Sequence, residues 1–315
     1  MIDNLIIIIP THNRHHYLKR VVHYYSSFPC KVYICDSSSE KVDIEHTDNI
    51  IYRWVPQSNF YGKVLDVLNE TAVDYYALSP DDDFLNRETL IECYKKLYEN
   101  TQYSFGIGKQ VFFEIPFKGN FFTFSGANGL ESFNTKPYQT HDEYLYSFWS
   151  CYQNVLWSLY KKEAIYNAFS ALASCNFSNG NFVELLLGIE GLRKGDVYIS
   201  EHGLNYREYS QGEHWGNTTP SITKDNINKY PSIREDVISF RSFYSNDGGF
   251  AWKCFTYYLD EGQRNRKNTL KYYIKKIIPT SIISLLRSFL NKKRKYMLDY
   301  SDKDMEAAIR NVLDT

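Results

Sequence analysis

The 315-residue sequence predicts an α/β fold in which a largely parallel sheet carries helices on both faces. The first observation behind this prediction is that the opening hundred residues alternate strand-like and helix-like segments. The second is the apolar run Leu5–Ile9, which is typical of a strand buried on both faces of a sheet. The third is that polar segments follow these strands, at the edge where such sheets bind ligands.

The elements of this first part follow from hydrophobic spacing. Leu5–Ile9 is the first strand, and we expect Pro10 to end it because proline has no N–H to donate. Asn86 is well placed to cap the helix that follows the fourth strand. We expect strands at 5–9, 31–35, 50–54 and 74–78, and helices at 18–25, 64–68 and 87–98.

The middle of the chain predicts shorter strands and then helices. Residues 103–125 indicate two or three strands with turns at Gly106 and Gly108, and residues 155–160 another strand. A helix at 180–194 ends at Gly195, a common terminating residue, and a last strand follows at 197–200. Residues 211–228 are polar and predict a loop, after which the chain reads as mostly helical.

The formal net charge of −1 conceals an uneven distribution. Residues 1–263 carry 23 basic and 32 acidic side chains, whereas residues 264–298 carry 11 basic and none acidic. An acidic body argues against a nucleic-acid binder and points to a local anionic partner for the basic segment. The start has no signal-peptide pattern, and the six cysteines form no Cys-x-x-Cys pair, so we expect reduced thiols and a cytoplasmic protein.

The most informative motif is Asp81-Asp82-Asp83, which directly follows a buried strand. Three adjacent carboxylates repel one another, and a divalent cation would relieve that repulsion. Hard oxygen ligands with open coordination positions suit Mg²⁺ or Mn²⁺ carrying a diphosphate. The alternative is a solvated acidic turn without a ligand.

Other polar residues at the predicted strand ends are candidates for holding a nucleotide. Asp36 could accept a hydrogen bond from a base or ribose, or could simply form an Asx turn. Thr11, Asn13 and Arg14 could face a phosphate, or could serve only to cap the next helix. Lys63, read as a loop residue, could balance phosphate charge or be solvated.

Glu184 is a candidate for catalysis and His202 for metal binding, and each has a competitor. Glu184, near the start of the 180–194 helix, could act as a general base, or could be a charge favoured by the helix terminus, with Glu190 as a competitor. His202 could complete a metal site, as could His214, although a lone histidine is more often a surface or core residue.

Residues 267–296 form a basic segment whose apolar residues recur at helical spacing. Its longest apolar part contains Arg287 and is too short to span a bilayer. Such a segment favours contact with an anionic membrane surface, and the alternative is a helix packed on the domain with a solvated basic face.

Taken together, these motifs resemble the family-2-like bacterial glycosyltransferases of GT-A fold that build capsule or lipopolysaccharide glycans. The resemblance rests on Ile6–Arg14, on Asp36–Ser39, on Leu78–Phe84 and, more loosely, on Asn181–Gly195. It implies a Rossmann-like nucleotide-diphospho-sugar transferase sheet with a helical C-terminal extension. It covers roughly residues 1–210 and implies a catalytic domain there, with a nucleotide-binding part at 1–100 and an acceptor part at 101–210. The residues that follow predict a loop and helical extension at 211–263 and a basic amphipathic helical tail at 264–315.

The resemblance also assigns roles to individual residues. Pro10, Thr11 and Asp36 would contact the nucleotide, together with the nearby Asn13, Arg14, Lys63 and Asp82. Asp81 and Asp83 would bind Mn²⁺ or Mg²⁺, with His202 a further candidate, and Glu184 would be the base. The family's usual Glu-Asp pair falls near Asn181-Phe182, where this sequence departs from the pattern.

The sequence therefore predicts a glycosyltransferase on the inner face of the cytoplasmic membrane. The donor would be a UDP-, GDP- or CMP-sugar, and the acceptor a glycan or lipid-linked glycan. A metal-dependent phosphotransferase or nucleotidyltransferase, or a non-catalytic membrane adaptor of the same fold, remains an alternative.

Overall fold

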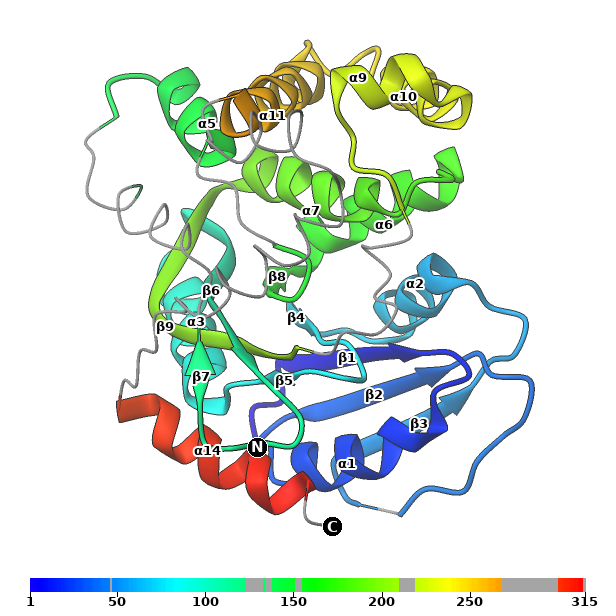
Figure 1. Ribbon diagram of the computed structural model, residues 1–315, viewed down its shortest axis with the longest axis vertical. Coiled ribbons are helices and arrows are strands. Elements are labelled where there is room, and N and C mark those ends of the chain that lie inside the picture. Colours follow the sequence, from blue (N-terminus) through cyan, green and yellow to red (C-terminus); the bar gives the residue numbers. More distant parts are fainter. Residues whose placement is uncertain are drawn as a thin grey trace, which may run out of the picture.

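The computed structural model describes residues 1–45, 47–122, 133, 138–150, 155–209, 219–267 and 300–313. Its centre is one curled, mixed sheet (Figure 1). Helices cover both faces of this sheet, as the sequence predicts. The hydrogen-bonded strand order is β3-β2-β1-β4-β8-β6-β9-β5, and β7 pairs with β6.

The first part of the sheet is parallel, in the order 3-2-1-4 expected of a nucleotide-binding α/β layer. Its strands end at one edge, where Thr11 pairs with Asp36 and Ile8 pairs with Leu78. The elements are β1 (Leu5–Thr11), α1 (His15–Tyr25), β2 (Lys31–Asp36), β3 (Ile50–Trp54), α2 (Phe60–Glu70), β4 (Tyr75–Leu78) and α3 (Arg87–Glu99).

The second part of the sheet is mixed, so the prediction of a largely parallel sheet holds only for the first. β4 pairs antiparallel with β8, β8 antiparallel with β6, and β6 parallel with β9. The short β5 pairs antiparallel with the far end of β9 and closes the sheet beside the acidic turn. The elements are β5 (Phe84–Leu85), β6 (Tyr103–Phe113), β7 (Phe121–Phe122), β8 (Leu159–Lys161) and β9 (Asp196–Glu208).

The remaining helices form two layers on one face of the sheet and one helix on the other. In Figure 1, α6 and α7 lie nearer the sheet, and α5, α10 and α11 lie beyond them. The final helix, α14, lies on the opposite side, against α1. These helices are α5 (His141–Ser150), α6 (Lys162–Cys175), α7 (Asn181–Lys194), α9 (Lys224–Lys229), α10 (Pro231–Phe243), α11 (Phe250–Lys267) and α14 (Tyr300–Leu313).

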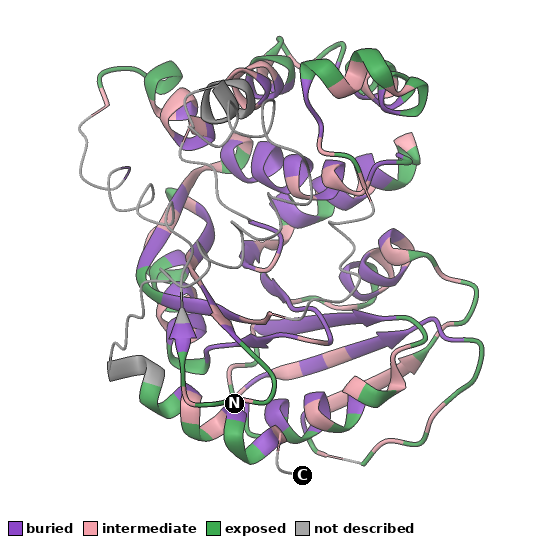
Figure 2. Ribbon diagram, in the orientation of Figure 1, coloured by how far each residue is buried: buried purple, intermediate pink, exposed green. Residues whose placement is uncertain are grey.

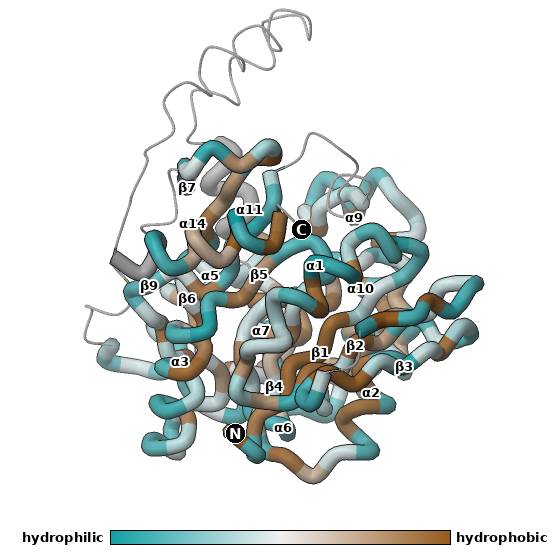
Figure 3. The backbone as a smooth tube through the Cα atoms, turned by 90° about the horizontal axis from the view of Figure 1, so that it is seen from below, coloured by the Kyte–Doolittle hydropathy of each residue, from teal (hydrophilic) through white to brown (hydrophobic). Residues whose placement is uncertain are grey.

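The core divides into two clusters because alternate residues of β1 face opposite sides of the sheet. Ile6 and Ile8 pack in the cluster that contains α2, α6 and α7. Leu5, Ile7 and Ile9 pack in the cluster that contains α1, α3 and α14. The whole of β1 is buried, as Figure 2 shows, and it is among the hydrophobic segments in the view of Figure 3. The continuous apolar run in the sequence is therefore explained by burial on both faces.

Three expected chain breaks are absent from the described strands. β1 continues through Pro10 because its pairing with β4 stops at Ile8, so that nothing on that side requires a proline N–H. β6 runs through Gly106 and Gly108 without a turn. A Cβ atom on Gly108 would lie 2.6 Å from the Cβ atom of Leu204, so this glycine permits close approach of β9 and does not reverse the chain.

The C-terminal region differs from the single tail that we predicted. α14 buries Met305, Ile309 and Val312 in the same cluster as α1 and α3, so residues 300–313 are part of the folded body. The predicted basic segment at 267–296, apart from its first residue at the end of α11, lies outside the described residues. Of the helices that the structure describes, none has both the length and the hydropathy needed to span a membrane.

Candidate functional site

The ends of β1, β2 and β4 bring three of the predicted polar residues together at one edge of the sheet. Thr11 ends β1 and pairs with Asp36, which ends β2. After β4, the Ser79 N–H donates to the carbonyl oxygen of Ile8, which holds the acidic turn beside β1. The Thr11 hydroxyl then donates to Asp81 Oδ2 at 2.6 Å. Strand register thus positions this part of the site.

Asp81 and Asp82 share one guanidinium. Arg14 Nη1 lies 2.8 Å from Asp81 Oδ1, and Arg14 Nη2 lies 2.6 Å from Asp82 Oδ2. Burial raises the pKa of Asp81 to about 6, and Arg14 and the Thr11 hydroxyl oppose that rise by favouring the charged form. The repulsion that the sequence predicts within the triplet is therefore relieved, in this structure, by an arginine.

Asp83 faces a different part of the molecule. Arg207 Nε lies 2.9 Å from Asp83 Oδ2, and the N–H of Glu208 donates to Asp83 Oδ1 at 3.0 Å. Burial raises the pKa of Asp83, and Arg207 opposes this rise. Both oxygens of Asp83 therefore hold the end of β9, directly beside the pairing of β5 with β9.

Asp81 and Asp82 present oxygens to one shared cationic group, whereas the predicted pair of Asp81 and Asp83 is divided between Arg14 and Arg207. Two carboxylates that already share one cationic group offer the hard oxygens that Mg²⁺ or Mn²⁺ prefers, and such ions usually keep places for phosphate and water. The carboxylate of Asp83 is committed to β9. Among the described residues, no group of three or more His, Cys, Asp and Glu side chains is arranged to hold a metal ion.

His202 is not brought to the carboxylates. It is exposed on β9, five residues before Arg207, which is roughly 16 Å of strand at the usual rise of about 3.3 Å per residue. At that separation His202 cannot share an ion with Asp81 or Asp82. His214 lies outside the described residues.

Asp36 is buried and accepts four hydrogen bonds. Its Oδ1 receives the N–H and hydroxyl of Ser38 at 2.8 and 2.5 Å, and its Oδ2 receives the Tyr52 hydroxyl at 2.7 Å and lies 3.1 Å from His15 Nε2. Burial would raise the pKa of Asp36, but the bonds from Ser38 and Tyr52 outweigh it and lower the pKa. The Asx turn weighed from the sequence is thus present, and a nucleotide would have to share or replace one of these partners.

The loop after β1 packs against the loop after β2. Asn13 has a positive φ of 54°, and its N–H donates to Ser38 Oγ at 2.7 Å. This left-handed backbone, which asparagine tolerates better than most residues, turns the chain into α1 and places Arg14 over the acidic turn. Arg14 itself makes no side-chain cap for α1. Pro10 is buried beneath this loop, within β1.

Lys63 lies on α2 and not in the loop that we predicted. Its side chain is buried, and its Nζ donates to the Thr11 carbonyl oxygen at 2.7 Å and to Ser37 Oγ at 3.0 Å. Burial lowers the pKa of Lys63, and the nearby Asp36 and Asp81 oppose this shift. Lys63 therefore connects the end of β1 to the loop after β2 from the α2 side of the sheet, and it places a positive charge next to Thr11.

Glu184 lies in the first turn of α7, half-buried near the Tyr160 hydroxyl. That hydroxyl donates to the carbonyl oxygen of Val155, which precedes β8, and the first residue of β8, Leu159, pairs with Ala77 of β4. The start of α7 is fixed from α10, because Asp236 accepts the Ser178 hydroxyl at 2.9 Å. The competitor Glu190 is buried and lies 3.2 Å from Arg193, so it has a structural partner.

Several residues of the site are not among the sequence predictions. Arg20 Nη2 donates to the carbonyl oxygen of Asp82 and to Glu208 Oε2, both at 2.8 Å. The Tyr17 ring contacts both Arg14 and Arg20, at 4.4 and 4.2 Å from their guanidinium carbons. The spacing of 14, 17 and 20 along one helix face was a signal for this set, whereas Arg207 and Glu208 required the pairing of β9.

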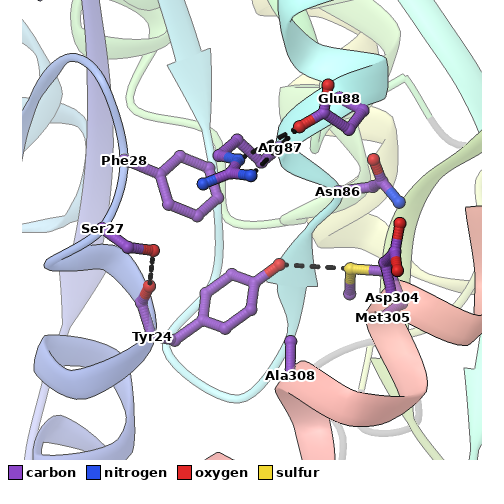
Figure 4. Close-up of a pocket in the computed structure, with 9 residues that line it drawn as sticks. All are labelled: Tyr24, Ser27, Phe28, Asn86, Arg87, Glu88, Asp304, Met305 and Ala308. Carbon is purple, nitrogen blue, oxygen red and sulfur yellow. Dashed lines mark hydrogen bonds and ion pairs between the residues drawn. The ribbon is translucent and has the colours of Figure 1, made fainter.

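Two pockets of the described structure lie away from these residues. One, of about 220 Å³, lies between α1, the start of α3 and α14, where the Tyr24 hydroxyl reaches Met305 Sδ (Figure 4). The other is an open groove beside Lys161, Lys162 and Lys194. Neither contains the residues at the carboxyl edge of the sheet, so the candidate site rests on its polar contacts and not on cavity size.

The fold corresponds to that of the GT-A glycosyltransferases. The chain is similar to the crystal structure of S. aureus TarS 1–349 in complex with UDP-GlcNAc, with a TM-score of 0.50, 11% identity, and coverage of 88% of this chain and 77% of that chain. The structure of TarS 1–349 alone gives a TM-score of 0.49, 12% identity, and coverage of 88% and 76%. No protein-family model matches the chain, and no curated protein matches it.

The similarity to TarS shows that the chain has a GT-A fold. The predicted Rossmann-like sheet with helices on both faces is thereby confirmed. At 11% identity this similarity concerns the fold alone.

Proposed function

We propose that the chain is a glycosyltransferase that moves a sugar from a nucleotide-sugar donor to a glycan or lipid-linked glycan. The observation that carries this proposal is the set of contacts at the carboxyl edge, where Thr11, Asp36 and Asp81 are joined through strand register and hydrogen bonds. In α/β sheets this edge is where ligands bind. The GT-A fold supports sugar transfer over other nucleotide chemistry.

The donor's nucleotide would bind over the loops after β1 and β2. Asn13, Asp36 and the buried Lys63 shape these loops, and Pro10 supports them from within β1. The bound ligand named for the TarS complex is UDP-GlcNAc, so UDP-sugars are the first donors to test. GDP- and CMP-sugars remain candidates that the residues of this chain do not separate.

Asp81 and Asp82 would hold a divalent cation together with the diphosphate of the donor. When bound, Mn²⁺ or Mg²⁺ would supply charge stabilisation for the departing nucleoside diphosphate. Arg14 is positioned at the same carboxylates and would stabilise negative charge on that group. Asp83 would act indirectly, by fixing the end of β9 beside the acidic turn.

Glu184 would accept the proton of the acceptor hydroxyl. The hydroxyl oxygen would form a bond to the anomeric carbon of the donor sugar as the bond from that carbon to the diphosphate oxygen breaks. The proton would go to the Glu184 carboxylate, and the bonding electrons would leave with the nucleoside diphosphate. Support comes from the place of Glu184 in the first turn of α7, beside the end of β8.

The basic segment 267–296 would bring this site to an anionic membrane surface, where a lipid-linked acceptor would be found. Residues 264–298, which include this segment, carry 11 basic and no acidic side chains. Support comes from the two helices that flank it, α11 and α14, since both belong to the folded body. The segment would then be attached to the domain at both ends.

A screen of UDP-, GDP- and CMP-sugars for release of free nucleotide tests the proposed activity. We expect release with one donor class, dependent on Mn²⁺ or Mg²⁺, and at least a hundredfold loss in Asp82→Asn. The matched control is Asp225→Asn, an exposed acidic residue on α9 whose activity should equal that of the wild type.

Other outcomes of the screen point to the other classes. No release and no binding of any donor would favour a non-catalytic adaptor. Transfer of a phosphate or nucleotide without release from a sugar donor would favour a phosphotransferase or nucleotidyltransferase, and either result would reject the glycosyltransferase.

A further inference from the structure

Arg14 lies between two carboxylates in the way that a bound cation would. Its two Nη atoms reach one oxygen each of Asp81 and Asp82, at 2.8 and 2.6 Å. The other arginines of the described site have different partners. Arg20 binds the carbonyl oxygen of Asp82 and the carboxylate of Glu208, and Arg207 binds the carboxylate of Asp83. One guanidinium thus fills the space that Asp81 and Asp82 share.

Arg14 is the component of this arrangement that can move. Its side chain is 37% exposed, whereas the side chain of Asp81 is 3% exposed and is also held by the Thr11 hydroxyl. The Tyr17 ring lies 4.4 Å from the guanidinium carbon and offers a surface on which it can shift. An exposed guanidinium can exchange partners readily, but a buried carboxylate cannot leave its own.

We propose that Arg14 occupies the cation position of the Asp81–Asp82 pair while no nucleotide is bound, and that a divalent cation takes this position as Arg14 transfers to the diphosphate. This inference rests on the proposed function, because it assumes a donor with a diphosphate. A guanidinium and a divalent cation cannot both lie between the same two carboxylates, since their charges repel at that separation. Phosphate oxygens offer the guanidinium the same two-pronged bonding that the carboxylates give it.

Removal of Arg14 should change metal binding in the direction opposite to that expected for a metal-supporting residue. If Arg14 competes with the metal ion, its removal strengthens metal binding, whereas loss of an ordinary supporting residue weakens it. Metal and nucleotide would also favour each other's binding, because each removes the obstacle to the other.

The test is a titration with Mn²⁺ alone, followed by the electron paramagnetic resonance signal of the free ion. We expect Arg14→Gln to bind Mn²⁺ about tenfold more tightly than the wild type, since one charge-assisted competitor is lost. Arg14→Lys, which keeps the charge but cannot reach two carboxylates with a planar fork, should lie between them.

Two variants control for location and for charge. Lys19→Gln removes one positive charge from an exposed position on the same helix and should leave the Mn²⁺ affinity within about twofold of the wild type. The double variant Arg14→Gln with Asp82→Asn should lose the tenfold gain, which would place the tighter ion at the shared carboxylates. Circular dichroism verifies that each variant is folded.

The possible outcomes are distinguishable. If Arg14→Gln binds Mn²⁺ as weakly as the wild type or more weakly, while the wild type still binds a donor with metal, the competition by Arg14 is wrong and the proposed function stands. If neither protein binds Mn²⁺ at millimolar concentration, with or without a donor, the metal site of the proposed function is wrong as well. Should Arg14→Gln not fold, Arg14→Lys decides, and an unchanged affinity in that variant overturns the inference.

Discussion

At the scale of single residues, the three adjacent aspartates have separate tasks. Asp81 and Asp82 share a guanidinium at the carboxyl edge of the sheet, and Asp83 holds the N–H of Glu208 and the side chain of Arg207. The sequence singles out the triplet as a candidate metal site, and the structure divides its three carboxylates between Arg14 and Arg207. The sequence does not predict the direction of each carboxylate, because that depends on β9, which pairs with this region from more than a hundred residues away.

Asp83→Asn should therefore affect mainly the stability of the fold, whereas Asp82→Asn should affect mainly Mn²⁺-dependent donor binding. Asp83→Asn should lower the free energy of unfolding by roughly 2–3 kcal/mol, because Arg207 loses its charged partner at a buried position, and should change Mn²⁺-dependent donor binding by less than about threefold. Asp82→Asn should cost less than about 1 kcal/mol of stability, because its partner Arg14 is partly exposed, and should weaken that binding at least tenfold.

Urea unfolding and calorimetric donor binding measure the two quantities on the same preparations. Equal loss of donor binding in both variants would contradict the separate tasks and would return Asp83 to the metal site.

At the scale of elements, the sequence predicts which segments form strands and helices better than where they begin and end. Asn86 caps α3 as predicted, with its Oδ1 accepting the Thr89 N–H at 3.0 Å. The strand end predicted at Pro10 and the turns predicted at the glycines of β6 are wrong, because these residues lie inside strands. Their effect is set by the neighbouring strand, which a local pattern does not contain.

The junction between α7 and α11 carries a pH-dependent contribution to stability. Asp247 accepts Arg193 Nη2 at 2.7 Å and the N–H groups of Gly249 and Ala251 at 2.9 and 2.8 Å. Burial would raise the pKa of Asp247, but the bonds from Arg193 and these N–H groups outweigh it and lower the pKa below its ordinary value of 3.8. The ionised carboxylate therefore stabilises the fold above about pH 4, and this contribution is lost as the pH falls through the lowered pKa.

Asp247→Asn should reduce the free energy of unfolding by roughly 1–2 kcal/mol at pH 7, and the difference from the wild type should shrink below about pH 4. Denaturant unfolding across pH 3–7 measures this. The control Asp225→Asn, at an exposed helix start, should stay within about 0.5 kcal/mol throughout. A difference that grows as the pH falls would contradict the assignment.

At the scale of the whole molecule, one sheet joins the N-terminal part of the chain to the side of the fold that carries α7 and Glu184. The alternation of apolar runs predicts the parallel first part, and the sheet class follows from it. The path β4-β8-β6-β9-β5 is not predictable in the same way, because it depends on pairings between residues 77 and 159 or 103 and 196. The packing of α14 against α1 is not predictable from local patterns either, because the two helices are far apart in the sequence.

This packing decides how the proposed membrane contact has to be tested. Truncation at residue 263 would remove α14 along with the basic segment, and with it the buried Ile309. Replacing residues 268–299 by a flexible Gly/Ser linker keeps α14 instead. We expect this variant to retain its thermal stability and donor binding, and to lose at least tenfold in binding to vesicles that contain phosphatidylglycerol.

A second variant, in which the run Lys292-Lys293-Arg294-Lys295 becomes serine, separates charge from apolar contact. Its vesicle binding should be weaker and less sensitive to salt than that of the wild type. Unchanged binding after the linker replacement, measured by vesicle sedimentation, would reject the membrane role of this segment.

The place of α14 also bears on the order in which the protein can be made. Met305, Ile309 and Val312 fill the cluster that surrounds the odd-numbered residues of β1, among the earliest parts of the chain to be translated. That side of the first strand is not complete until residue 312 has left the ribosome, roughly 200 residues after α3. At about 5–20 residues per second, this delay is on the order of 10–40 s. During that time the nascent chain exposes apolar surface between α1 and α3, and we expect it to depend on chaperones until its last described helix arrives.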